Sequence, residues 1–101
     1  MKIYELKNDL NELFAFEMSN TLLSRNKTVK IIGLLPNAKI NIRPKLFSLS
    51  NQDKFCEFEF MDDIFIIEEP WGDNSRYWLG PKSLKYNPNL IKIAEHFKNI
   101  N

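Results

Sequence analysis

Two neighbouring stretches decide the fold of this chain: Lys54-Phe55-Cys56-Glu57-Phe58-Glu59-Phe60 and Ile64-Phe65-Ile66-Ile67. In the first, apolar and acidic residues alternate from Cys56 to Phe60, which is the period-two pattern of a half-buried strand. The second is apolar throughout, as a more fully buried strand is. Met61-Asp62-Asp63 between them predicts a turn, so residues 54 to 69 are expected to form an antiparallel hairpin.

The end of the chain has the period of a helix. Apolar side chains recur at three- and four-residue spacing from Leu90 to Ile100, and Asn87-Pro88 supplies a cap followed by a proline at the first helical position. We expect a helix from about Pro88 to Asn99, whose apolar stripe packs on the sheet that contains the hairpin.

Other segments add strands to this sheet. We expect strands over residues 28–35, 38–42 and 76–79, the last ended by Gly80-Pro81. Pro44 keeps residues 46–49 at an edge of the ladder or outside it. The residues from Pro70 to Ser75 are typical of a loop.

The N-terminal third fits two patterns. Leu10, Leu13, Phe14 and Met18 form a helical stripe, whereas Phe14, Phe16 and Met18 also alternate as in a strand. A helix from about Asn8 that gives way near Phe16 is the favoured alternative. The whole chain, residues 1–101, is thus expected to be one α+β domain with a mostly antiparallel sheet of four to five strands, a C-terminal helix and an N-terminal helix.

The near-neutral net charge of +1 hides a strong segregation of charge along the chain. Residues 55–75 contain seven acids and no Lys or Arg, whereas residues 25–54 contain seven Lys or Arg and a single acid, Asp53. Such acids are most often solvated outer faces of strands, but they can also form an anionic surface that steers a basic protein partner. With Trp71 as an apolar anchor, the residues expected to bind that partner are Glu57, Glu59, Asp62, Asp63, Glu68, Glu69, Trp71 and Asp73.

Catalytic and metal-binding patterns are missing from the sequence. The only Cys, Cys56, falls on the inward face of its strand and is expected in the core, and the only His, His96, lies beside the apolar stripe of the last helix. No Gly-x-Ser-x-Gly, Gly-x-Gly-x-x-Gly, P-loop or calcium-loop pattern occurs. We therefore expect no enzymatic activity, no cofactor and no metal, and a cytoplasmic protein, because no signal or membrane-spanning segment is present either.

Nucleic-acid binding is the alternative function. The basic run of residues 25–54 could hold phosphates, with Phe47 nearby. The aromatics are not interleaved with the basic residues as a stacking platform, however, and the acidic segment would repel a polyanion.

Trp, Tyr and Arg are the residue types that dominate binding hot spots. All three occur around a rigid polar turn in the segment Glu69-Pro70-Trp71-Gly72-Asp73-Asn74-Ser75-Arg76-Tyr77-Trp78. In this segment and in its general make-up, the chain resembles the small immunity proteins that bacteria encode beside polymorphic or contact-dependent growth-inhibition toxins. The resemblance implies a cytoplasmic protein that binds and neutralises a cognate toxin domain, often a nuclease with a basic active-site cleft. It assigns no role to any single residue.

Overall fold

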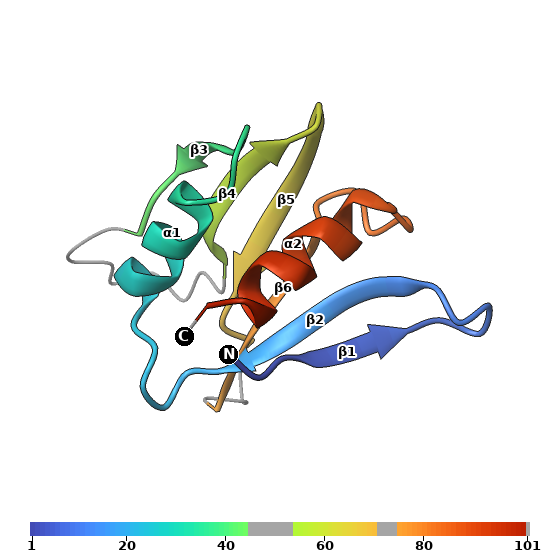
Figure 1. The fold of residues 1–101 in the computed structure, drawn as a ribbon, viewed down its shortest axis with the longest axis horizontal. Coiled ribbons are helices and arrows are strands. Elements are labelled where there is room, and N and C mark those ends of the chain that lie inside the picture. Colours follow the sequence, from blue (N-terminus) through green and yellow to red (C-terminus); the bar gives the residue numbers. More distant parts are fainter. Residues whose placement is uncertain (45–53, 71–74, 101) are drawn as a thin grey trace.

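Eight elements make up the part of the chain that the computed structural model describes, residues 1–44, 54–70 and 75–100. In chain order they are β1 (Tyr4–Lys7), β2 (Leu13–Ser19), α1 (Arg25–Gly33), β3 (Lys39–Ile42), β4 (Lys54–Phe60), β5 (Asp63–Glu68), β6 (Arg76–Pro81) and α2 (Asn89–Lys98) (Figure 1). The α+β class and the C-terminal helix are as expected.

The six strands form one antiparallel sheet in the order β1-β2-β6-β5-β4-β3. The sheet is therefore larger than the four to five strands expected from the sequence. Its edges are β1 and β3, and the segment containing α1 connects β2 near one edge to β3 at the other.

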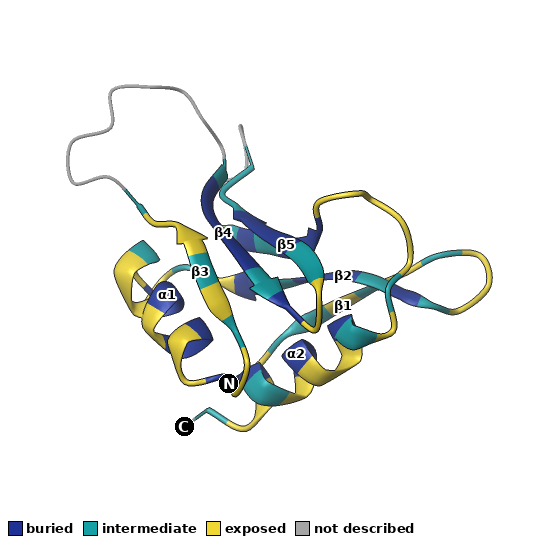
Figure 2. Cartoon of the chain, turned by 90° about the horizontal axis from the view of Figure 1, so that it is seen from above, coloured by how far each residue is buried: buried dark blue, intermediate teal, exposed yellow. Residues whose placement is uncertain are grey.

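Both helices pack on the same face of the sheet (Figure 2). The core between the layers joins strand residues such as Phe16 and Phe58 to Ile32 of α1 and Phe97 of α2, all fully buried. The rings of Phe16 and Phe97 meet edge to face with centroids 5.5 Å apart. No helix in the described part of the chain covers the opposite side, which we call the helix-free face.

The expected N-terminal helix is wrong, because residues 13–19 form strand β2. β2 lies between β1 and β6, and the adjacent residues Ala15 and Phe16, which point to opposite faces, are both inaccessible to solvent. The pairing with β1 also shifts register, since Leu6 lies opposite Ala15 but Lys7 lies opposite Leu13. This bulge places one extra residue in β2 and interrupts the simple alternation of a strand.

The expected strand over residues 28–35 is also wrong, because residues 25–33 form helix α1. The β-branched residues Thr28, Val29, Ile31 and Ile32 favour a strand by propensity, yet all four are buried on one helical stripe. Ser24 begins the helix, since its side-chain oxygen accepts a hydrogen bond from the Lys27 amide at 3.0 Å.

The central hairpin is as expected, with β4 and β5 joined by a turn in which Met61 and Asp62 have positive φ angles of 54° and 68°. The strand over 38–42 is present as β3 and the last helix as α2, where the Asn87 side chain accepts a hydrogen bond from the Asn89 amide. β6 runs through Gly80-Pro81 instead of ending before them. The expectation for residues 46–49 falls outside the described residues.

Candidate functional site

The β4–β5 hairpin places two of the expected acids on the helix-free face. Phe58 lies opposite Phe65 and stacks on it in the core, with ring centroids 5.7 Å apart. Because side chains alternate along a strand, Glu57 and Glu59 on either side of Phe58 point the other way. Figure 2 shows that this side of β4 carries no helix.

Glu57 is held by cations of its own chain. Its Oε1 atom lies 3.0 Å from Lys82 Nζ and 3.3 Å from Lys54 Nζ, and the residue is only 9% exposed. The hydrogen bond from Lys82 holds the pKa of the Glu57 carboxyl below its usual range, against an opposing effect of burial. The Glu57 charge is therefore largely compensated within the free protein.

Three other acids gather at the turn between β4 and β5, and we call Glu59, Asp62 and Asp63 the turn acids. Glu59 pairs with Ile64 across the hairpin and with Lys39 of β3 on its other side, and it points to the helix-free face. Asp63 pairs with Phe60 and therefore lies on the helix-bearing face at the same end of the hairpin. Asp62 is exposed, and Asp63 accepts a long hydrogen bond of 3.4 Å from Asn89 Nδ2. None of the three forms an ion pair with another described residue.

A pocket of about 360 Å³ opens beside the turn acids. It lies between the turn and the loop after β6, and its lining consists of Asp62, Asp63, Ile64, Pro81, Lys82, Ser83 and Asn87. The Lys82 ammonium is already engaged by Glu57. The carboxylates of Asp62 and Asp63 can therefore receive a cationic side chain from another molecule.

Glu68, the last residue of β5, and Glu69, which follows it, lie at the opposite end of the strand from the turn acids. These two acids differ in their roles. Glu69 accepts hydrogen bonds from Arg25 Nη2 at 2.6 Å and from Asn20 Nδ2 at 3.0 Å, so it ties the start of α1 to the sheet. Glu68 pairs with Lys54 on one side and Trp78 on the other. The structure thus separates Glu68 and Glu69 from the turn acids, and the expected positions Trp71 and Asp73 fall outside the described residues.

A cluster that the sequence analysis did not include lies on the helix-free face near β1. The Arg76 guanidinium stacks 3.6 Å from the centre of the Tyr4 ring and forms an ion pair with Glu17 at 3.2 Å. Trp78 pairs with Glu17 and is half-buried, while Tyr77 points into the core, where its hydroxyl donates to the Leu23 carbonyl at 2.7 Å. The alternation along residues 76–79 predicts this division, but only the strand order brings Tyr4 to Arg76.

The basic residues of the stretch 25–54 that the structure describes lie on several elements, and two of them are held in ion pairs. Arg25 is paired with Glu69 and Lys54 with Glu57. Lys27 and Lys30 belong to α1, and Lys39 to the edge strand β3. Phe47 and the residues around it lie outside the described part.

The two side chains with the most reactive chemistry are used in packing. Burial raises the pKa of the Cys56 thiol to about 12, with Arg43 opposing the rise. His96 Nε2 lies 2.7 Å from the Ile31 carbonyl oxygen and thereby links the two helices. Within residues 1–44, 54–70 and 75–100, no three His, Cys, Asp or Glu side chains converge as a metal site, and no helix is long and apolar enough to cross a membrane.

No family model, curated protein or solved structure matches the chain. The candidate site therefore rests on the geometry of this molecule alone.

Proposed function

We propose that the protein is an immunity protein, which binds and neutralises a cognate bacterial toxin domain in the cytoplasm. The observation that carries the proposal is the grouping of the turn acids Glu59, Asp62 and Asp63 without an ion pair to any described residue. Glu59 points to the helix-free face and Asp63 to the helix-bearing face, so the turn acids surround the end of the hairpin, and a cationic partner surface that covers this end gains charges that no described residue holds in an ion pair.

A toxin with a basic cleft fits this surface, and a nuclease is the class that has such a cleft for its polyanionic substrate. The turn acids attract the cleft during diffusional encounter, which raises the association rate. An Arg or Lys of the toxin then enters the pocket beside Asp62 and Asp63. Occupying the cleft in this way excludes the substrate.

The rest of the proposed surface contributes less directly. Glu57 and Glu68 extend it over the helix-free face, and Trp71 and Asp73 are included from the sequence as its continuation beyond β5. Glu69 is expected to stabilise the fold without contacting the toxin directly, because its carboxylate already accepts hydrogen bonds from Arg25 and Asn20.

The test is a charge-reversal series, Glu59→Lys, Asp62→Lys and Asp63→Lys, titrated calorimetrically against the toxin domain encoded by the neighbouring reading frame. We expect each variant to bind the toxin more weakly. Where the replaced carboxylate is buried against a toxin Arg or Lys, the loss of binding free energy should be about 2–5 kcal/mol, because the partner charge is left unpaired. Asp9→Lys is the matched control, since Asp9 is an exposed acid in the β1–β2 turn.

Unchanged affinity and unchanged salt dependence across the three variants would refute the proposed surface. The protein should also leave RNA and DNA unretarded in a gel. Retardation with a steep salt dependence, weakened by substitution of Lys30 or Arg43, would favour the nucleic-acid-binding alternative.

A further inference from the structure

Strand β1 is an edge of the sheet with no neighbour on its outer side among the described residues (Figure 1). Such a strand presents backbone N–H and C=O groups that can pair with another strand. The bulge in the β1–β2 pairing lies in β2, because one step from Leu6 to Lys7 matches two steps from Ala15 to Leu13. The backbone of β1 is therefore regular over its whole length.

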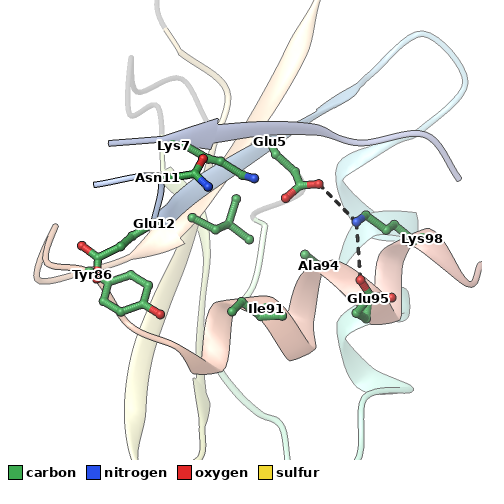
Figure 3. A pocket seen from close by; sticks show the side chains of 10 residues that line it. Glu5, Lys7, Asn11, Glu12, Tyr86, Ile91, Ala94, Glu95 and Lys98 are labelled. Atoms are coloured by element: carbon green, nitrogen blue, oxygen red, sulfur yellow. Dashed lines mark hydrogen bonds and ion pairs between the residues drawn. The ribbon is translucent and has the colours of Figure 1, made fainter. Parts of the chain in front are cut away.

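The side chains of β1 alternate between the two faces of the sheet. Glu5 pairs with Phe16 and its Oε1 atom lies 3.2 Å from Lys98 Nζ of α2, so Glu5 is on the helix-bearing face. Lys7 is two residues further on and lies on the same face, as Figure 3 shows. Leu6 lies between them on the helix-free face. One acid and one base thus flank Leu6 on one side of the edge.

We propose that β1 pairs antiparallel with β1 of a second copy of this chain, about a two-fold axis at Leu6. In this register Glu5 lies opposite Lys7 of the second copy, and Lys7 lies opposite its Glu5. The sheet becomes continuous across the dimer, and two opposite-charge cross-strand pairs form on the helix-bearing face.

The neighbouring registers are disfavoured by the same charges. An axis at Glu5 places the two Glu5 carboxylates opposite each other, and an axis at Lys7 does the same with the two ammonium groups. Registers shifted by a single residue put the helices of the two copies on opposite sides of the sheet. Among registers that keep the helices on one side, the axis at Leu6 pairs unlike charges and its two neighbours pair like charges.

The helices leave room for this arrangement. α2 packs over β2, and two copies of β1 between the two β2 strands separate these by three strand spacings, about 14 Å. That distance accommodates two helices of about 10–12 Å diameter side by side. The groove of about 250 Å³ between α2 and the β1–β2 hairpin, with the exposed Ile91 at its rim, then faces the same groove of the second copy (Figure 3).

The other edge strand lacks this complementarity. With an axis at Ile40, β3 would place Lys39 opposite Asn41 of a second copy, and with an axis at Asn41 it would place Lys39 opposite Arg43. Neither register pairs unlike charges. The pairing between copies is therefore specific to β1, and it does not depend on the proposed binding of a toxin.

The experiment is sedimentation velocity over a concentration series with the wild-type chain, Glu5→Lys, Lys7→Glu and an equimolar mixture of the two variants. We expect a reversible wild-type dimer and an association constant about tenfold or more lower for each variant alone. The mixture should recover dimers, because the substituted position 5 of one variant then faces the substituted position 7 of the other with unlike charges. The remaining pair, Lys7 of the first variant and Glu5 of the second, is native and also of unlike charge.

Lys92→Glu, an exposed position on α2, is the matched control for Lys7→Glu and should sediment as the wild type does. Circular dichroism confirms that each variant folds, and Glu5→Gln and Lys7→Gln replace any reversal that does not, with a smaller loss of dimer expected. A wild-type chain that stays monomeric throughout the series overturns the proposal. So does a dimer that neither reversal weakens, or a mixture that associates no better than its components.

Discussion

The indole ring of Trp78 lies across Gly80, two residues further along β6: a Cβ atom built on Gly80 would come within 2.6 Å of the Trp78 Cη2 atom. The other close atoms, Cζ2 and Cζ3 at 2.9 and 3.1 Å, belong to the same ring. Gly80 is thus needed for close packing on the helix-free face, and the half-buried indole covers the backbone where a side chain is missing.

We predict that Gly80→Ala lowers the free energy of unfolding by about 1–3 kcal/mol, because the indole must leave its position or the strand must move. Denaturant unfolding measures the change. Gly33→Ala is the control, since a Cβ at Gly33 near the end of α1 would meet no atom within 4 Å apart from its chain neighbours and the backbone of its own helix. It should stabilise the protein by about 0.5–1 kcal/mol.

A double variant separates the clash from a general loss of strand stability. In a Trp78→Leu background the flat ring is absent, so adding Gly80→Ala should cost clearly less than it does in the wild type. An equal cost in both backgrounds would show that the ring is not the obstacle.

Phe97 should be among the most costly residues to truncate. It is inaccessible to solvent and packs edge to face on Phe16 of β2, so it attaches α2 to the sheet. Phe97→Ala is expected to cost about 3–5 kcal/mol in a thermal or chemical melt. Ile91→Ala on the exposed side of α2 should change stability by no more than about 0.5 kcal/mol. A stable Phe97→Ala protein would contradict the packing of α2 described above.

The elements that could be predicted from the sequence are those in which one local period explains the burial. In the hairpin formed by β4 and β5, apolar residues alternate with acids from Cys56 to Phe60 of β4, and α2 buries a single stripe, so a period of two or 3.6 residues identifies each. β2 is buried on both faces and contains a bulge, so its pattern resembled a helix. Four of the nine residues of α1 are β-branched, and its buried stripe and its Ser24 cap outweigh their preference for strands.

The candidate site was predictable only in part, because charge patterns along the chain do not say which charges meet in space. Glu57 and Glu69 belong to the acidic segment, but strand order and the position of α1 bring Lys82 and Arg25 to them from distant parts of the sequence. The turn acids form no ion pair with another described residue, and the turn predicted at Met61-Asp62-Asp63 is sufficient to place Asp62 and Asp63 at the end of the hairpin.

The Cys56 thiol should be inert in the folded protein. It is inaccessible to solvent, and burial raises its pKa to about 12, so the thiolate that reacts with disulfide reagents is scarce near pH 8. We expect labelling by 5,5′-dithiobis(2-nitrobenzoate) to be limited by opening of the structure and to become rapid in denaturant. Labelling in native buffer at the rate of the unfolded chain would contradict this prediction.

Glu57 should make the stability of the protein depend on acid pH. The hydrogen bond from Lys82, followed by that from Lys54, lowers the pKa of its carboxyl in the folded state from the ordinary value of 4.5, although burial acts in the opposite direction. The ionised form is therefore favoured by folding, and its contribution to stability is present above pH 4.5 and is lost as the pH falls through the lowered folded-state pKa. Glu57→Gln should then be less stable than the wild type by about 1 kcal/mol at pH 7, a modest value because both lysines are partly exposed, and the difference should shrink on acidification. Urea unfolding between neutral and strongly acidic pH measures this difference. Lys82→Gln removes the largest cause of the pKa shift, so it should flatten the acid dependence of the free energy of unfolding more than Lys54→Gln does. The reverse order would show that the ion pair with Lys82 does not stabilise the fold. So would a stability difference between Glu57→Gln and the wild type that grows as the pH falls.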